Sequence, residues 1–352
     1  MEHHKHTYSV DVTIDTKKNR AEITGELSEK EFASFVKEAL TSFKKEAEIS
    51  GFRKGHVPEK ILIEKIGMQA VLEEGAELAL AHIYPHIIEE KKLDVVGSRP
   101  TVKITKLAEK NPLGFSISVS VMPEIKNLDY KKIASKKNKE KTTTEEVTEK
   151  ELEEVITQLK GVHARRSAKE NETVDEKTIA SIELTDDLVK TFGDFTNIED
   201  FKTKIKENLT KEKEHKAIEK KRIELFEELI EKTDIAVPEP LIESEQSRML
   251  NQFKGDVEKM GVTWDDYVKH VKKTEDEMKK EWEKDAEKRA KLEIILDHIA
   301  REEKITPAEE KVQEEIGHLM SYYKDIETHT ARHYVSGILI RQATIDFLEK
   351  IQ

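Results

Sequence analysis

The chain has 352 residues, with 61 Lys or Arg, 73 Asp or Glu and a formal net charge of -12. At roughly 100 to 200 residues per domain, this length favours two or three domains. The acidic total argues against general nucleic-acid binding but allows a local basic patch, and the lack of cysteine excludes disulfides and thiolate chemistry.

The first 122 residues have the pattern of an α+β domain. Alternating apolar positions predict a first strand with Tyr8, Val10, Val12 and Ile14 on one face, followed by a turn at 17–19 and a second strand. Helical spacing of apolar residues predicts helices over 28–43, 58–66 and 68–91, and alternation returns at 102–104 and 115–121. Strands grouped around a block of helices favour the α+β class.

From residue 123 onward the pattern is mainly helical. Residues 131–150 are polar, and a helix is expected from 148. Long amphipathic helices are expected from 198, after the break at 237–240, and from 307 to the end. Ser or Thr followed three residues later by Glu predicts capping boxes at Ser28, Thr148 and Thr274. The high, balanced charge favours elongated helices with charged outer faces.

One short segment has a composition suited to docking. It reads Gly51, Phe52, Arg53, Lys54, Gly55, His56, Val57, Pro58. Two glycines allow a tight exposed loop, an exposed phenylalanine calls for a partner, and arginine binds a carboxylate or phosphate through two hydrogen bonds. The alternative is an ordinary turn with a buried Phe and two surface cations.

This segment resembles the ribosome-docking loop of the trigger factor family, whose pattern is Gly-Phe-Arg-x-Gly-Lys-x-Pro. An amphipathic helix precedes it and an Ile/Leu helix follows Pro58, as in the family. Further similarity lies in the strand and Pro-Glu-Ile exit at 115–125 and in the segments 183–193, 234–242 and 303–306. His56 stands where the family usually has Lys, which makes one docking charge depend on pH.

The resemblance implies an N-terminal ribosome-binding domain at 1–122 and a helical chaperone domain at 123–352, which includes a linker at 123–182 and forms extended arms around a cradle. It implies an ATP-independent, cytoplasmic chaperone that docks at the ribosome exit, near its protein and rRNA, and shields nascent polypeptides. The implied docking residues are Gly51, Phe52, Arg53, Lys54, Gly55, His56 and Pro58. Only residues 163–182 separate the segments that flank the family's prolyl isomerase domain, so we expect that domain and its enzyme activity to be absent.

Flexible apolar side chains on the later helices are candidates for client binding, because methionine repacks easily against varied partners. They are Met249, Phe253, Met260, Met278 and Met320. The alternative for each one is packing between helices.

We expect no cofactor and no metal. The chain has no Walker loop and no Gly-x-Gly-x-x-Gly, and His3, His4 and His6 lack a nearby acidic cage. We also expect no binding to DNA or membranes, and a weak homodimer is compatible with the family. Two other classes stay open at this point: a helical adaptor that never visits the ribosome, and an isomerase with an unrecognised site.

Overall fold

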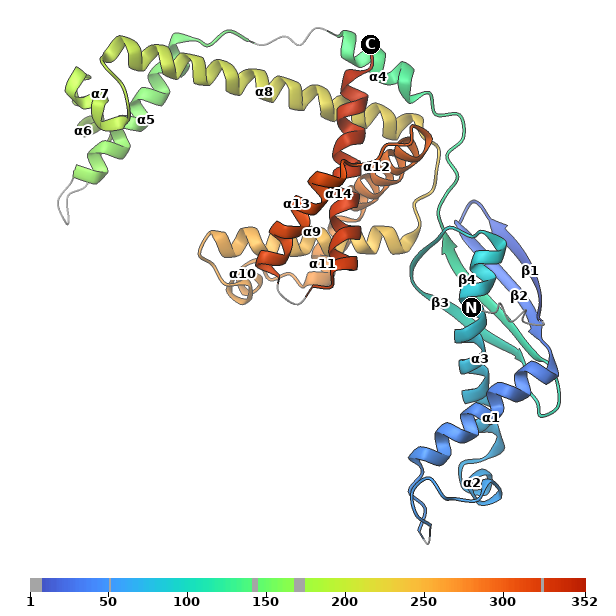
Figure 1. The fold of residues 1–352 in the computed structure, drawn as a ribbon. Helices are drawn as coiled ribbons and strands as arrows, with labels where there is room; N and C mark the ends of the chain where they lie inside the picture. Colours follow the sequence, from blue (N-terminus) through green and yellow to red (C-terminus); the bar gives the residue numbers. More distant parts are fainter. Residues whose placement is uncertain (1–7, 51, 141–144, 168–174, 324–325) are drawn as a thin grey trace. The chain divides into compact units, whose positions relative to one another are not determined.

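The computed structural model describes residues 8–50, 52–140, 145–167, 175–323 and 326–352. Contacts between residues divide the chain into two compact units. The first contains residues up to Leu128 together with Thr233–His298, and the second contains Asp129–Lys232 together with Ile299–Gln352. Helices dominate both, and the described strands lie in the first (Figure 1). Across the described ranges, no helix is both long enough and apolar enough to cross a bilayer.

A four-stranded antiparallel sheet forms the N-terminal part of the first unit. Its strands are β1 (Tyr8–Asp15), β2 (Arg20–Leu27), β3 (Val95–Lys106) and β4 (Leu113–Val121), in the order β1-β2-β4-β3. Ile23 of β2 lies opposite Ile117 of β4, and both are fully buried. One face of the sheet is therefore apolar, as period-two alternation requires.

Two helices cover this apolar face, and a third joins them. They are α1 (Glu29–Glu46), α3 (Met68–Lys91) and the short α2 (Glu59–Ile66) (Figure 1). A Cβ on Gly75 of α3 would lie 3.0 Å from the Cα of Val36, so α1 and α3 pack with their backbones close together. The predicted order of elements is confirmed, and so are the bounds 68–91. The predicted capping box at Ser28 is wrong, because this side chain makes no cap hydrogen bond.

The remainder of the first unit is helical and touches the sheet at two points. Its helices are α9 (Glu239–Lys259), α10 (Trp264–Val271), α11 (Glu275–Glu281) and most of α12 (Glu283–Glu302). Asn19, at the β1–β2 turn, donates from its amide nitrogen to the Ala236 carbonyl over 2.6 Å. A Cβ on Gly97 of β3 would lie 2.8 Å from the Pro240 ring. The capping box at Thr274 is confirmed.

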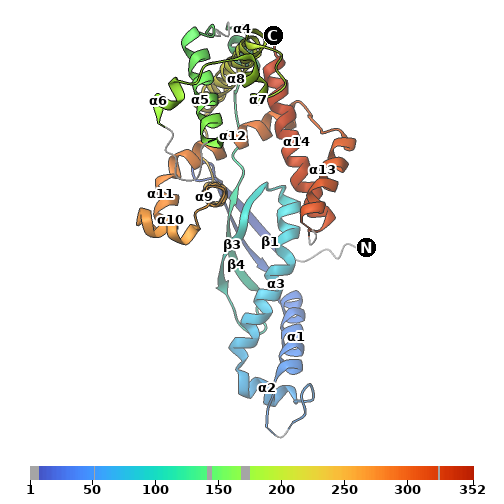
Figure 2. The same ribbon diagram turned by 90° about the vertical axis from the view of Figure 1, so that its left-hand side faces the viewer.

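The described part of the second unit is helical and includes two small apolar clusters. Its helices are α4 (Tyr130–Lys139), α5 (Glu149–Ser167), α6 (Glu176–Ala180), α7 (Asp186–Phe192), α8 (Ile198–Lys232), α13 (Glu309–Tyr322) and α14 (Thr328–Lys350). One cluster surrounds Phe201 of α8, and the other joins α13 to α14, which lie side by side (Figure 2). The capping box at Thr148 is confirmed by reciprocal bonds with Glu151. The sequence does not predict α4, because residues 131–150 are mostly polar.

The predicted fold class is confirmed, with an α+β N-terminal part followed by mostly helical structure. The predicted domain bounds, 1–122 and 123–352, stay a prediction.

Candidate functional site

The loop between α1 and α2 has a buried, hydrogen-bonded base. It lies at the end of these helices that points away from the sheet (Figures 1 and 2). Val57 and, in the following helix, Leu62 are fully buried. Pro58 occupies the N-cap position of α2, and its carbonyl accepts hydrogen bonds from the N–H groups of Ile61 and Leu62, both at 3.0 Å. Proline pre-sets the backbone for a helix start, so the loop returns to the fold at a fixed point.

Two tight turns shape the rest of the loop. The Phe52 N–H donates to the Ile49 carbonyl over 3.1 Å, and the His56 N–H donates to the Arg53 carbonyl over 2.9 Å. Gly55, the third residue of the second turn, has φ of +82°, which is the positive value that a type II turn requires at this place. Glycine is the residue that adopts this conformation without strain.

The loop presents an aromatic side chain and basic groups to solvent. The Phe52 side chain is 38% exposed, and Arg53, Lys54 and His56 are also exposed. The Lys54 ammonium lies 3.4 Å from Glu48, but both side chains are largely in water, where such a pair contributes little. The alternative with a buried Phe does not describe this loop. Gly51 lies outside the described residues.

The candidate client-binding residues have different environments. Met260 is 78% exposed at the end of α9, whereas Met278 is 4% exposed and packs in the interior. Met249 is half-buried beside a cavity of about 180 Å³ that Arg289 and Trp282 also line. Met320 is half-buried against the α13–α14 cluster.

Phe253 is the centre of an aromatic group on α9, on α10 and at the C-cap of α11. Its ring centroid lies 6.0 Å from Trp264, 5.3 Å from Tyr267 and 5.5 Å from Trp282. The Lys254 ammonium lies 5.1 Å from the Trp264 ring centroid and 2.6 Å from Glu275. Hydrogen bonds from Lys254 and from the Trp264 indole lower the pKa of Glu275. This group is half-buried, so it combines packing with some accessible aromatic surface.

Sequence reasoning missed a set of apolar side chains in the second unit that are more exposed than the aromatic group around Phe253. On α13 and α14 and just after α13 these are Tyr322 at 83% exposure, Tyr323 at 64%, Tyr334 at 59% and Ile338 at 45%. On α8 they are Ile218 at 52% and Ile223 at 56%. No local signal separates these side chains from buried ones, because neighbouring helical residues can share a buried face, as Val71 and Leu72 do on α3.

The described residues contain no group of three or more His, Cys, Asp or Glu side chains placed to hold a metal ion. His3, His4 and His6 lie outside the described residues. Most of the side chains described above are aromatic, apolar or basic groups at or near the surface.

Fold and site together define an arrangement of a small sheet and many helices, with a basic loop that exposes a Phe and with exposed apolar side chains on the helices. A family model described as bacterial trigger factor protein matches residues 10–158, and the model of the trigger factor C-terminus matches residues 197–345.

Curated relatives agree with this match. The trigger factor of Listeria monocytogenes serotype 4b is 25% identical, with 87% of this chain and 89% of the relative covered. The trigger factor of Finegoldia magna is 26% identical, with 86% and 85% covered. A solved trigger factor chaperone, described in work on promiscuous substrate recognition in folding and assembly, is 17% identical with a TM-score of 0.54 over 97% of this chain and 100% of the other. The chain belongs to the trigger factor family, which is a family of ribosome-associated chaperones.

Proposed function

We propose that this protein is an ATP-independent chaperone that docks on the ribosome through the loop at 51–58 and shields emerging polypeptides from aggregation. The observation that carries the docking proposal is the combination of an exposed Phe52, Arg53 and Lys54 with a fully buried Val57 a few residues later. The buried anchor fixes the backbone, and the exposed aromatic and cationic groups suit a site with acidic protein surface and RNA phosphate.

Client binding would use surfaces on the helices. We assign it to Met249, Phe253, Met260 and Met320 together with the exposed tyrosines Tyr322, Tyr323 and Tyr334. Such scattered apolar and adaptable side chains favour weak, multi-site binding without a fixed pocket. Met278 would act indirectly, since its side chain packs in the interior.

We propose that the protein is not an enzyme and lacks the prolyl isomerase domain of its family. The two family models leave only residues 159–196 between them. The described part of that segment contains the end of α5, the short α6 and α7, and its length is too small for a β-rich barrel. The chain would also need no cofactor.

The proposed partners are the ribosomal exit-site protein, nearby rRNA and nascent chains. We propose a cytoplasmic location, a weak homodimer in the free state, and no binding to DNA or membranes. The alternative of a helical adaptor that does not bind ribosomes is not supported by the family assignment.

Cosedimentation with bacterial ribosomes tests the docking proposal. The test variant is Phe52→Ala, Arg53→Ala and Lys54→Ala in one chain. A matched control combines Ile218→Ala, Lys220→Ala and Lys311→Ala, which removes one exposed apolar side chain and two exposed cations elsewhere. We expect the parent and the control to pellet with ribosomes at low salt, where charge contacts are strongest, and the test variant to stay in the supernatant.

Two results would contradict this. If the test variant pellets as well as the parent, the loop is not the anchor. If the parent does not pellet at low salt, the ribosome-docking function itself is wrong.

A further inference from the structure

The strand β3 forms one edge of the sheet, with β4 as its neighbour on one side. Its residues Val102 and Ile104 lie opposite Ile117 and Phe115 of β4, and residues directly opposite in a sheet share a face. Ile117 and Phe115 are buried at 0% and 1% exposure, yet Val102 and Ile104 are 43% and 42% exposed. The apolar face of the sheet therefore continues to its edge, where the covering helices no longer reach it.

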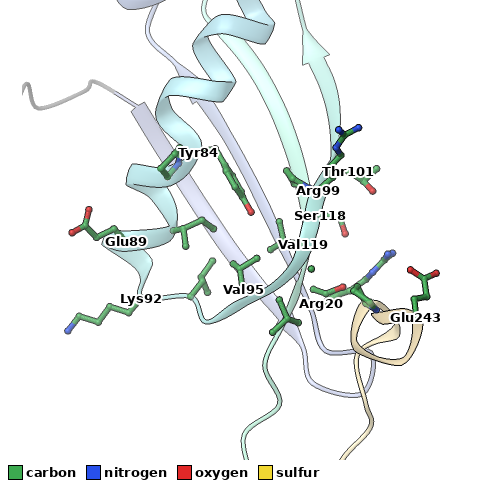
Figure 3. A pocket seen from close by; sticks show the side chains of 18 residues that line it. Arg20, Tyr84, Glu89, Lys92, Val95, Arg99, Thr101, Ser118, Val119 and Glu243 are labelled. Carbon is green, nitrogen blue, oxygen red and sulfur yellow. The ribbon is translucent and has the colours of Figure 1, made fainter. Parts of the chain in front are cut away.

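A cavity of about 670 Å³ lies beside the first half of this strand. Tyr84 and Ile88 line it from α3, and Val95 and Pro100 line it from β3 (Figure 3). Pairing with β4 is interrupted between Val96 and Thr101, so the backbone is irregular here. Pro100 lies two residues before Val102. We call Pro100, Val102 and Ile104 the apolar edge strip, which leads away from the cavity along the strand.

The charged side chains of the strand are all basic. Arg99, Lys103 and Lys106 are exposed, and no residue of 95–106 is acidic, although the whole chain has a net charge of -12. Lys106 lies 3.6 Å from Glu26. Lys103 lies opposite Ser116 and so projects from the polar face of the sheet, on the side opposite to Val102 and Ile104. The strand thus offers apolar contacts on one face and positive charge on the other.

We propose that β3 binds an extended segment of an unfolded polypeptide as an additional strand. An edge strand presents backbone N–H and C=O groups for such pairing, and addition of a peptide strand is an established mode of recognition. The preferred segment has Val, Ile or similar side chains at alternate positions, which contact the apolar edge strip, and acidic side chains between them, which face Arg99 and Lys103. This inference rests on the proposed chaperone function and adds a binding mode and a client chemistry to it.

The charges favour this occupant over a second copy of the chain. Pairing two β3 strands would place like charges across from one another, which destabilises a sheet. The start of the strand is already in contact with Pro240 of α9 at Gly97. The pairing surface is therefore the segment 99–106, which is long enough for a strand of ordinary length.

Fluorescence anisotropy with the full-length protein tests the proposal. The probe is a fluorescein-labelled peptide of about ten residues that alternates Val or Ile with Glu. The test variant is Val102→Thr with Ile104→Thr, in which threonine keeps a high strand propensity. The matched control is Ile14→Thr on the opposite edge strand β1, where Ile14 is 49% exposed. A second peptide with N-methylated internal amides keeps the side chains but donates no backbone hydrogen bonds.

We expect the parent and Ile14→Thr to bind the first peptide equally, and the double variant to bind it about tenfold more weakly, since two cross-strand contacts are lost. Lys103→Glu should also weaken binding of this peptide and should favour a peptide with Lys in place of Glu. The N-methylated peptide should not bind. Strand addition would be overturned if the double variant and the control bind the peptide equally. It would also be overturned if the parent binds the N-methylated and the unmethylated peptide equally.

Three further measurements on the same preparations separate the possible failures. If sedimentation shows that the parent dimerises and that Val102→Thr with Ile104→Thr abolishes the dimer, the edge pairs with a second copy and the proposal is wrong. Ribosome cosedimentation and suppression of aggregation of a denatured protein test the chaperone function itself. A parent that is active in both chaperone assays but does not bind the Val/Ile–Glu peptide contradicts strand addition alone. A parent that is inactive in both assays contradicts the proposed function.

Discussion

The N-terminal sheet and the linker helix α4 are both fixed by residues far away in the sequence, but through different interactions. The sheet shares one continuous apolar core with α1 and α3, in which side chains such as Ile23, Phe115 and Ile83 are almost completely buried. Helix α4 buries only Tyr130, Ile133 and Ala134. Much of its attachment is polar. A regular apolar pattern therefore predicts the first region well, whereas the second depends on partners that no local pattern reveals.

The polar contacts of α4 reach two distant helices. Lys136 pairs with Glu228 of α8 at 3.1 Å, and Lys137 pairs with Glu224 at 3.4 Å. The side-chain amide of Asn138 donates to the carbonyls of Leu348 and Ile351, both at 2.8 Å. These carbonyls lie at the end of α14, where backbone acceptors have no partner within the helix. The Leu348 carbonyl also accepts from the Ile351 N–H over 3.4 Å, so Asn138 supplies the Ile351 carbonyl with a donor and the Leu348 carbonyl with a second, shorter hydrogen bond.

The largest expected effect comes from the apolar core. Phe115→Ala should lower the local stability of the sheet by about 3–5 kcal/mol, because it removes a buried ring and leaves a cavity. Phe52→Ala, on an exposed side chain of the same type, should change it by less than about 0.5 kcal/mol. Hydrogen exchange of the β2 and β4 amides measures this locally, which a single unfolding midpoint of a multidomain chain does not. Equal effects of the two substitutions would show that the sheet does not depend on this core.

An intermediate effect is expected at α4. Asn138→Ala should weaken the last turn of α14 by about 1–3 kcal/mol, since it removes the donor of the Ile351 carbonyl and leaves the Leu348 carbonyl with only the longer bond from the Ile351 N–H. Lys139→Ala, on the next and exposed residue, is the control and should have almost no effect. Hydrogen exchange of the α14 amides in the region of Leu348 reports the difference. A similar result for both variants would mean that the amide contacts do not hold α14.

The smallest effect is expected at the surface pair between α13 and α14. Hydrogen bonds from Arg332 and from Gln313 lower the pKa of Glu309 to about 2. Arg332→Gln should raise this pKa toward the ordinary value of 4.5, and Gln313→Ala should raise it less because the charged partner remains. Carboxyl chemical shifts in an NMR titration measure both. An unchanged pKa in Arg332→Gln would show that the two side chains do not pair in solution.

The sign of the pH effect follows from the direction of that shift. A carboxylate whose pKa is lowered in the folded state stabilises that state above the unfolded pKa. The contribution of Glu309 is therefore complete above pH 4.5 and declines as the pH falls toward 2. In Arg332→Gln this decline should be largely absent.

Much of the fold could be predicted because its signals are local. Alternation predicted the strands, helical spacing predicted α3 at its observed bounds, and the Thr-x-x-Glu pattern predicted the caps at Thr148 and Thr274. The same pattern failed at Ser28, which occupies an N-cap but makes no side-chain bond there. Helix α4 was missed because its three buried residues span too short a stretch to establish a period.

In the candidate site, too, features with a local sequence signal could be predicted and features that depend on distant packing could not. The glycine and proline pattern predicted an exposed turn, and Gly55 has the positive φ that this requires. The exposure of Tyr322 and the burial of Met278 could not be predicted, because they depend on how each helix is oriented against its neighbours. The exposure of Val102 is likewise a result of strand order, which the alternating pattern does not specify.

The turn between β1 and β2 places two demands on one amino acid. Asn19 has φ of +48° and is 3% exposed, and its amide donates to the carbonyl of Ala236. Glycine accepts the backbone conformation but has no donor, and aspartate accepts it but offers only acceptors at neutral pH. A randomised library at this position, selected for a folded chain, should therefore return asparagine, although glycine is the usual choice in such a turn.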